Sequence, residues 1–263
     1  MNIEERKKIT EALIGTFESA GKLSLDLREK GLKEKIKEDN TPVTNGDLEV
    51  NKLIINRITK ITPNLPIISE ELSLNKNKEN LKNFWLIDPI DGTYDYINNK
   101  DEFTLNAALI LNNKPAIGII NAPDKKRLFY SYGAGNSFEI NEQKKTSKLL
   151  AGKHSNREDL LAVSYSKNLK PEILNIHKKY KIQKFVKMKS SLKFCVIAAG
   201  EYDLYVAEPR ACEWDIAAGH AILEHAGGSI NDTEGKEIFY GKKDFKNPGI
   251  ILKGFKLIYD RSN

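Results

Sequence analysis

The sequence of 263 residues predicts a layered α/β protein made of two halves. Residues 103–140 contain four short strand-like runs separated by tight turns, a pattern typical of an antiparallel meander. After a lysine-rich junction at 141–158, strand-like and helical runs alternate, which favours a mixed or parallel sheet. We therefore expect an N-terminal half at residues 1–145 and a C-terminal half at 146–263.

Two amphipathic helices are expected before the first sheet. Apolar residues recur at helical spacing over 9–27, and Gly31 is placed to stop that helix. Thr44 can cap a second helix, whose apolar positions extend over 50–61. Asp47 follows Thr44 at the spacing of a capping box, so taken alone it is explained as an acid that stabilises a helix start.

The apolar run Phe84–Ile87 indicates a short buried strand, preceded by another at 65–68. The strand delivers Asp88 to its carboxyl end. Pro89 is expected to end the strand, because proline lacks the backbone N–H that a ladder uses. Asp91 then presents a second carboxylate one short turn later.

Gly92 and Thr93 lie where a new helix could begin, with backbone N–H groups able to face a phosphate. Two acids on a rigid turn, followed by such a helix start, suit a divalent cation that holds a phosphoryl group. A strand that ends in a polar turn and a helix cap would carry the same residues. This motif alone therefore leaves both interpretations open.

In the C-terminal half, strand-like and helical runs alternate up to a closing Gly-Gly pair at 227–228. In chain order the runs are 161–164 (strand), 171–180 (helix), 184–188 (strand), 191–199 (helix), 204–207 (strand) and 215–225 (helix). Asp215 stands at the start of the last helix, where a helix dipole alone would favour an acid.

The composition limits the classes of function. Hydrophobic residues make up 40% and charged residues 30% of the chain, with a net charge of +6, as in soluble globular proteins. The lysines are dispersed among acids, which argues against a nucleic-acid polymer as partner. Cys195 and Cys212 lack CxxC spacing, which fits a reducing compartment and disfavours a zinc site.

Targeting signals are not expected either. The N-terminal residues have no apolar core of a signal peptide, and no run approaches the ~20 apolar residues of an integral membrane segment. We expect a cytoplasmic protein, and peripheral association with the inner membrane stays open.

Several motifs together resemble the inositol monophosphatase superfamily. Residues 88–93 have the form D-P-[IL]-D-G-T of its metal-binding signature. Residues 214–218 resemble its W-D-x-A-A block, which precedes a helix and the Gly-Gly at 227–228. The Glu-Glu pair at 70–71 and the P-V-T-x-x-D pattern at 42–47 stand upstream, in the order found in the superfamily.

The resemblance implies an α-β-α-β-α sandwich of the sugar-phosphatase type and a phosphomonoesterase with two or three Mg²⁺ ions per site. Asp88 would bridge two ions, with Glu70 and the Ile90 carbonyl completing one site and Asp91 and Asp215 the other. Such oxygen donors suit Mg²⁺. The resemblance also implies inhibition by Li⁺ and allows a homodimer.

Glu70, Thr93 and Asp47 are the catalytic residues that the resemblance implies, and Thr93 and Asp47 would orient a water for in-line attack. The metal site is expected at the junction of the two halves, because Asp215 comes from the second half.

Within the superfamily, the sequence most resembles the 3′(2′),5′-bisphosphate nucleotidases of the CysQ type. The likeness is carried by residues 101–110, 190–195 and 213–215. Ser190 and Lys193, one turn apart at a helix start, could bind a second phosphate of the substrate. A helix N-cap followed by an ordinary surface lysine explains the same spacing.

Two departures from that pattern bear on the substrate. Val206 and Ala207 stand where such nucleotidases usually have an arginine, and Arg210 could replace it. Glu208 stands where inositol monophosphatases have a glutamate that contacts the sugar. The expected substrate contacts are Asp91, Gly92, Thr93, Ser190, Lys193, Glu208, Arg210 and Asp215.

The expected partner is thus a small phosphate ester, and the expected reaction is hydrolysis of adenosine 3′,5′-bisphosphate (PAP) to AMP and phosphate. Its sulfated relative PAPS, converted to APS, is a second expected substrate, which points to sulfur assimilation or nucleotide turnover. An inositol 1-phosphatase or a sugar phosphatase of the fructose-1,6-bisphosphatase kind is the alternative. A protein that binds nucleic acid or another ligand without catalysis is the alternative from a different class.

Overall fold

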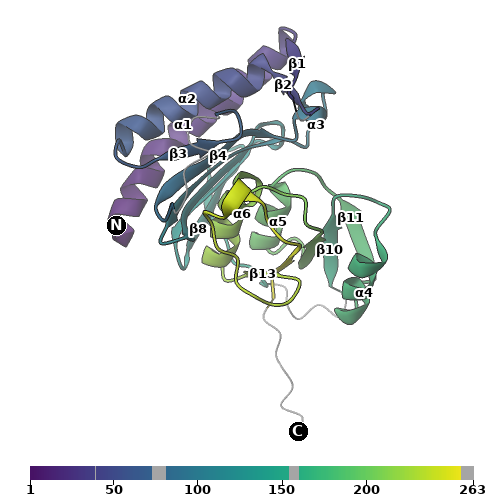
Figure 1. Cartoon of the computed structure of the whole chain (residues 1–263). Helices are drawn as coiled ribbons and strands as arrows, with labels where there is room; N and C mark the ends of the chain where they lie inside the picture. Colours follow the sequence, from purple (N-terminus) through teal and green to yellow (C-terminus); the bar gives the residue numbers. More distant parts are fainter. Residues whose placement is uncertain (39, 73–80, 154–159, 256–263) are drawn as a thin grey trace.

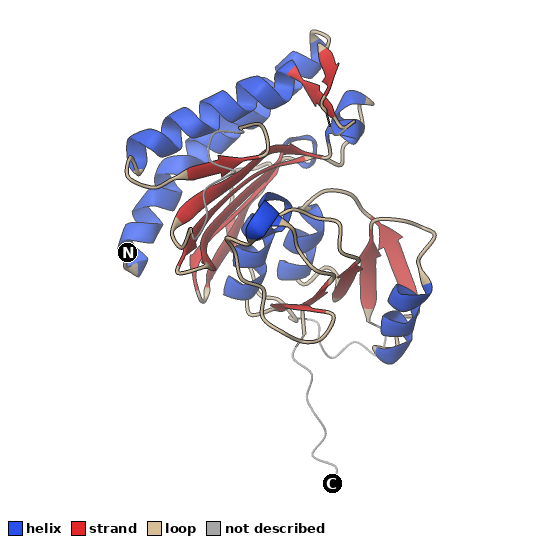
Figure 2. Cartoon of the chain, in the orientation of Figure 1, coloured by secondary structure: helices blue, strands red, loops and turns tan. Residues whose placement is uncertain are grey.

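The computed structural model describes residues 1–38, 40–72, 81–153 and 160–255, which form five layers (Figures 1 and 2). Helices α1 (Ile3–Glu29) and α2 (Asn45–Ile61) cover one face of a seven-stranded sheet. Helices α5 (Leu192–Ala198) and α6 (Glu213–His225) lie between that sheet and a five-stranded one. Helix α4 (Pro171–Lys179) covers the outer face of the second sheet. The α-β-α-β-α sandwich is therefore confirmed.

The seven-stranded sheet has the order β3-β4-β5-β6-β7-β8-β9. Strand β3 runs parallel to β4, and all later neighbours are antiparallel, which confirms the meander. The last strand was not predicted, because it lies within the lysine-rich segment taken as a junction. The strands are β3 (Ile67–Ser69), β4 (Phe84–Asp91), β5 (Thr104–Leu111), β6 (Lys114–Ala122), β7 (Arg127–Gly133), β8 (Asn136–Ile140) and β9 (Thr146–Lys148).

Strand β4 contributes to two cores at once. Trp85 and Ile87 pack with α1 and α2, whereas Phe84 and Leu86 pack with α5 and α6. The side chains alternate because successive residues of a strand point to opposite faces of the sheet. The unbroken apolar run Phe84–Ile87 is thus explained by helices on both faces.

The prediction that Pro89 ends this strand is wrong. The strand extends to Asp91, and its register with β5 shifts between Asp88 and Asp91. Asp88 pairs with Asn106 and Asp91 with Thr104, so three steps along β4 face two steps along β5. The extra residue forms a bulge, in which a proline without an N–H is tolerated.

The bulge also determines where the two acids point. In a regular strand, Asp88 and Asp91 would face opposite sides, because they are three residues apart. Their partners Asn106 and Thr104 are two residues apart on β5 and share one face. The bulge therefore turns both carboxylates to the same side of the sheet.

The close approach of α6 to the first sheet depends on Gly118 in β6. A Cβ at this position would lie 2.3 Å from the carbonyl oxygen of Ala218, so no other residue fits without moving the helix. Helix α6 also contacts β4 and β5. This packing brings the first turn of α6, which carries Asp215, toward β4.

The five-stranded sheet has the order β11-β10-β12-β14-β13 and is mixed, as predicted. Its strands β13 and β14 and the hairpin β1–β2 were not predicted. Among the described residues, every helix is too short or too polar to cross a lipid bilayer. These strands are β10 (Leu161–Ser164), β11 (Lys184–Lys187), β12 (Leu204–Ala207), β13 (Ser229–Asp232), β14 (Ile250–Lys253), β1 (Glu34–Ile36) and β2 (Pro42–Thr44).

Candidate metal and phosphate site

Three carboxylates from separate segments converge in the structure. Glu70 directly follows β3, Asp88 lies in β4, and Asp215 lies in the first turn of α6. One oxygen from each carboxylate lies within 4.8 Å of the other two. We call Glu70, Asp88 and Asp215 the acidic cluster.

The acidic cluster has the properties of a divalent-cation site. Asp88 is 1% exposed, and its Oδ1 atom is buried without a hydrogen-bond partner among the described residues. Burial, together with the charges of Glu70, Asp91 and Asp215, raises the pKa of Asp88 well above its ordinary value. Burial and the charges of Asp91 and Glu70 also raise the pKa of Asp215. A cation would satisfy the buried oxygen and remove the repulsion, and oxygen donors suit Mg²⁺.

Asp91 is held by Ser191, which directly precedes α5. Ser191 Oγ lies 2.7 Å from Asp91 Oδ2 and 2.6 Å from the Asp215 carbonyl oxygen. Asn106 of β5 donates to the same Ser191 oxygen at 3.3 Å. Ser191 is 2% exposed and connects β4, β5 and α6 beside the acidic cluster. The sequence prediction selected its neighbour Ser190 and missed this residue.

A chain of hydrogen bonds leads from α2 to the end of β4. The N–H and the hydroxyl of Thr44 both donate to Asp47 Oδ2, at 2.7 and 2.6 Å, which confirms the capping box. The Thr93 hydroxyl lies 3.2 Å from both Asp47 Oδ1 and the Ile90 carbonyl oxygen. Burial raises the pKa of Asp47. These contacts hold the Thr93 hydroxyl in a defined orientation.

The helix start predicted after Asp91 is confirmed. Helix α3 (Thr93–Ile97) begins directly after Gly92, whose φ of 98° is in the left-handed region that favours glycine. A Cβ at Gly92 would also lie 3.1 Å from the Glu102 carbonyl oxygen. This sharp turn places Thr93 beside the two acids of β4.

Lys37 belongs to the site and was not predicted. Its Nζ atom lies 2.9 Å from Glu70 Oε1 and 2.6 Å from Glu71 Oε1. Burial alone would lower the pKa of Lys37, but the two glutamates raise it above its ordinary value. In a chain with many lysines, no local signal separates this one from the others.

Ser190 and Lys193 are both buried, so the alternative of an ordinary surface lysine is wrong. Lys193 is 6% exposed, its Nζ atom donates to the Ser190 carbonyl oxygen, and it lies 5.2 Å from the ring centroid of Tyr205. Burial lowers the pKa of Lys193 to about 8, although the charge of Asp91 acts in the opposite direction.

Arg210 and Glu208 both contact Tyr165. The Arg210 guanidinium lies 4.1 Å from the ring centroid of Tyr165. The Tyr165 hydroxyl donates to Glu208 Oε1 at 3.3 Å, and Lys170 Nζ lies 2.8 Å from Glu208 Oε2. The hydrogen bond from Lys170 lowers the pKa of Glu208. Both carboxylate oxygens of Glu208 are therefore engaged within the protein.

A pocket of about 460 Å³ lies next to these residues. Four of its seven lining residues are cationic and none is acidic. Within the described residues, none of the four cations forms an ion pair. We call this the basic pocket, and its lining residues are Tyr165, Ser166, Lys167, Asn168, Lys187, Lys189 and Arg210.

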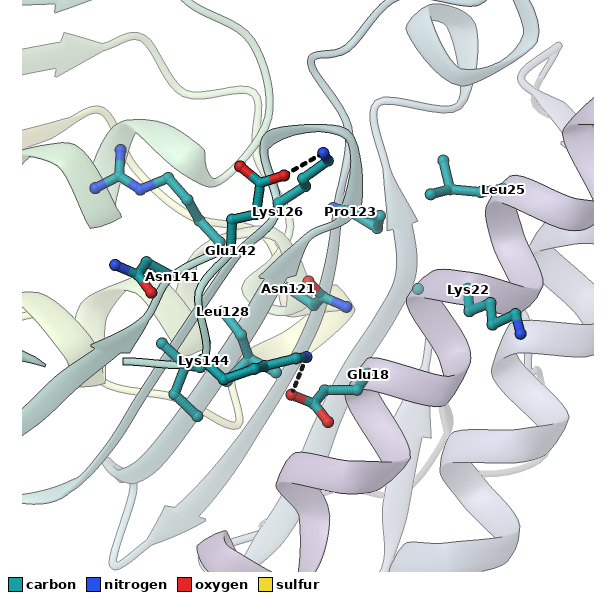
Figure 3. Close-up of a pocket in the computed structure, with 13 residues that line it drawn as sticks. Glu18, Lys22, Leu25, Asn121, Pro123, Lys126, Leu128, Asn141, Glu142 and Lys144 are labelled. Carbon is teal, nitrogen blue, oxygen red and sulfur yellow. Dashed lines mark hydrogen bonds and ion pairs between the residues drawn. The ribbon is translucent and has the colours of Figure 1, made fainter. Parts of the chain in front are cut away.

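Another pocket, of about 290 Å³, lies between α1 and strands of the seven-stranded sheet (Figure 3). Two of its lysines pair with acids of the same pocket: Lys144 lies 2.8 Å from Glu18, and Lys126 contacts Glu142. It contains none of the residues that were predicted for the site. We assign this pocket no function.

The layered fold and the carboxylates at the end of β4 define the class of protein. The chain belongs to the inositol monophosphatase family, whose sequence profile matches residues 5–258. Within that family, it is 33% identical over 215 residues to the 3′(2′),5′-bisphosphate nucleotidase CysQ of Salmonella typhimurium, covering 81% of this chain and 85% of the relative.

Two further relatives agree with this placement. The 3′(2′),5′-bisphosphate nucleotidase CysQ of Buchnera aphidicola is 36% identical over 237 residues, covering 89% of this chain and 88% of the relative. The crystal structure of CysQ from Bacteroides thetaiotaomicron superposes with a TM-score of 0.74 at 28% identity, covering 93% of this chain and 96% of that one. The predicted resemblance to the CysQ type is confirmed.

Proposed function

We propose that this protein is a phosphomonoesterase that hydrolyses PAP to AMP and phosphate, with PAPS as a second substrate. The proposal rests on the position of two neighbouring sites. The acidic cluster attracts cations, and the basic pocket beside it attracts anions. Arg210 of the basic pocket lies close enough to Asp215 for its charge to lower the pKa of that acid, against the effect of burial. The activity named for the CysQ relatives supports the same reaction.

The proposed cofactor is Mg²⁺, with two or three ions per site. Asp88 would bridge two ions, Glu70 and the Ile90 carbonyl would hold one of them, and Asp91 and Asp215 would hold the other. When bound, the ions would neutralise phosphoryl oxygens and activate the attacking water. The fit rests on the all-oxygen donor set and on the buried oxygen of Asp88, which has no hydrogen-bond partner among the described residues.

Thr93 and Asp47 would position the attacking water. Because Thr44 donates twice to Asp47 Oδ2, Asp47 Oδ1 is the atom that accepts from the Thr93 hydroxyl. The Thr93 oxygen then keeps a lone pair for a proton of the water. Glu70 is the third member of the proposed catalytic set. The water oxygen bonds to phosphorus, the bond to the ribose 3′ oxygen breaks, and that oxygen leaves with a proton.

The 3′-phosphate of the nucleotide would lie at the metal end, against Asp91, Gly92, Thr93 and Asp215. The 5′-phosphate would lie against three residues, Ser190, Lys193 and Arg210. Lys193 supplies a buried positive charge, and Arg210 supplies an exposed guanidinium with no hydrogen bond to a described residue. Charged hydrogen bonds of this kind contribute roughly 1.5–3 kcal/mol each.

The contacts of Glu208 help to distinguish PAP from inositol monophosphate as the substrate. An inositol monophosphatase would use this glutamate to contact the sugar, yet its carboxylate is engaged by Tyr165 and Lys170. Inositol monophosphate also lacks a second anionic group for Lys193 and Arg210. Both observations favour a bisphosphorylated nucleotide over an inositol phosphate.

The test is kcat/KM for PAP, inositol 1-phosphate and fructose 1,6-bisphosphate at identical Mg²⁺ and salt concentrations. We expect PAP to be preferred by at least tenfold. Preference for inositol 1-phosphate would refute the proposal. Salt-sensitive nucleic-acid binding without release of phosphate from any monoester would instead favour a non-catalytic protein. The homodimer and the cytoplasmic location stay predictions, to be tested by sedimentation and by cell fractionation.

A further inference from the structure

The basic pocket carries more positive charge than the hydrolysis of PAP uses. Of its four cations, only Arg210 is assigned to the 5′-phosphate of PAP. Lys167 follows β10, whereas Lys187 ends β11 and Lys189 lies two residues further on. These three lysines have no ion-pair partner within the described part of the chain and are assigned no contact with PAP.

The basic pocket adjoins the residues assigned to the 5′-phosphate. Lys189 immediately precedes Ser190, and its charge lowers the pKa of Lys193, as does that of Arg210, after the larger effect of burial. Arg210 is two residues before Cys212, whose N–H donates to Asp215 Oδ2 at 2.7 Å. Arg210 therefore lies near both Asp215 and Lys193, and the basic pocket that it lines includes Lys187 of the outer strand β11 of the second sheet.

The side chains in the basic pocket are available to a ligand. The Arg210 guanidinium stacks on Tyr165, and none of its N–H groups has a hydrogen-bond partner among the described residues. Lys167 and Lys187 are exposed, and Lys189 is half-buried. Of the three residues assigned to the first 5′-phosphate, Arg210 lines the volume of about 460 Å³, whereas Ser190 and Lys193 do not.

We propose that the basic pocket binds the second phosphoryl group of a 5′-diphosphate chain. Nucleotides that carry a 3′-phosphate and a 5′-diphosphate are then a further substrate class of this enzyme, and the products are the 5′-diphosphate and inorganic phosphate. The inference rests on the proposed function, because it uses the same metal end for the 3′-phosphate. A terminal phosphate brings up to two negative charges to Lys167, Lys187 and Lys189, which have no ion-pair partner among the described residues.

The test compares three substrates that differ only at the 5′ position: adenosine 3′-phosphate, PAP, and adenosine 3′-phosphate 5′-diphosphate. Phosphate release is measured at fixed Mg²⁺ and at two ionic strengths. We expect kcat/KM to rise about tenfold from PAP to the 5′-diphosphate. We also expect the 5′-diphosphate to lose more activity at the higher ionic strength, because its contacts are more charged.

Lysine variants test whether the basic pocket causes the preference for the 5′-diphosphate over PAP. Lys167→Gln and Lys187→Gln should each lower the ratio of kcat/KM for the 5′-diphosphate to that for PAP, and the double variant should lower it about tenfold. Lys52→Gln is the matched control, because it removes an exposed lysine from α2, in the outermost layer, and should leave the ratio unchanged.

Two outcomes separate this inference from the function on which it rests. If PAP is hydrolysed but the 5′-diphosphate is no better, or if the double variant keeps the wild-type ratio, the inference alone is wrong. If neither nucleotide releases phosphate, the proposed function fails and the inference fails with it.

Discussion

Replacing Asp88 by asparagine should stabilise the metal-free protein while it abolishes turnover. Asp88→Asn removes one charge from the acidic cluster with almost no change in shape. Oxygens of the three carboxylates lie within 4.8 Å of one another, and two unit charges at that separation repel by about 3.5 kcal/mol at an effective dielectric constant of about 20. Asp88 can avoid part of this repulsion by taking up a proton. We therefore expect a gain of about 1–3 kcal/mol at neutral pH.

The gain should depend on pH in a defined direction. Burial and the neighbouring carboxylates raise the pKa of Asp88 in the folded protein above its value in the unfolded chain. The stability that this group contributes is complete below the unfolded pKa and is lost as the pH rises toward the folded pKa. The loss amounts to at most about 1.4 kcal/mol per pH unit. Asparagine does not titrate, so the advantage of Asp88→Asn should increase from pH 5 to pH 8.

The assay is urea unfolding of the wild type and of Asp88→Asn in EDTA at pH 5, 6.5 and 8, repeated with Mg²⁺. A ligand at a hundredfold excess over its Kd stabilises the folded state by about 2.7 kcal/mol, and only the wild type should gain this amount. PAP hydrolysis should disappear in the variant. A variant that is less stable than the wild type in EDTA at every pH would refute the repulsion argument. Substantial turnover by the folded variant would refute the assignment of Asp88 as the bridging ligand.

Three further variants test other parts of the structure. Ser191→Ala removes the hydroxyl that contacts Asp91 and the Asp215 carbonyl oxygen, and it should weaken Mg²⁺ binding about tenfold in titration calorimetry. Lys193→Ala should raise KM for PAP about tenfold or more, with little effect on hydrolysis of a small monoester such as p-nitrophenyl phosphate. His225 has a pKa lowered by burial from 6.5 to about 4, so the stability that its neutral form contributes is present above pH 6.5 and is lost as the pH falls to about 4. In His225→Gln this loss, up to about 3 kcal/mol, should be absent from the pH dependence of unfolding.

Each of these predictions has an outcome that contradicts it. Ser191→Thr keeps the hydroxyl and should bind Mg²⁺ more tightly than Ser191→Ala, so equal affinities would show that the hydroxyl has no positioning role. Equal losses of Lys193→Ala on both substrates would indicate that Lys193 supports the fold or the metals rather than recognition. If His225→Gln and the wild type lose stability in parallel between pH 6.5 and 4, the titration of His225 is not the cause.

Local sequence patterns were sufficient for several contacts between residues that are close in the chain. The Thr44–Asp47 capping box spans three residues, and the helix start at Gly92 follows from a glycine directly after Asp91. The alternating burial of Phe84–Ile87 follows from the two-residue period of a strand with a core on each face. Because such interactions depend on a few neighbouring backbone angles, their residue types appear at fixed spacing in the sequence.

The placement of Asp88 and Asp91 marks the limit of local patterns. Pro89 indicated the end of the strand, yet β5 continues the pairing beyond it through a bulge. The bulge, not the spacing of the two acids, turns both carboxylates to one side of the sheet. Whether a proline ends a strand or is accommodated depends on the neighbouring strand, which the local sequence does not contain.

The contacts that complete the site are separated by much longer stretches of chain. Lys37 reaches Glu70 across 33 residues, and Ser191 reaches Asp91 across 100. The basic pocket combines three segments, at 165–168, 187–189 and 210. The sequence by itself determined most of the helices and the central strands, the family motifs and the carboxylates of the acidic cluster. Only the tertiary structure decided which lysine and which serine meet those carboxylates, because such contacts depend on how whole sheets and helices pack and leave no periodic signal in the chain.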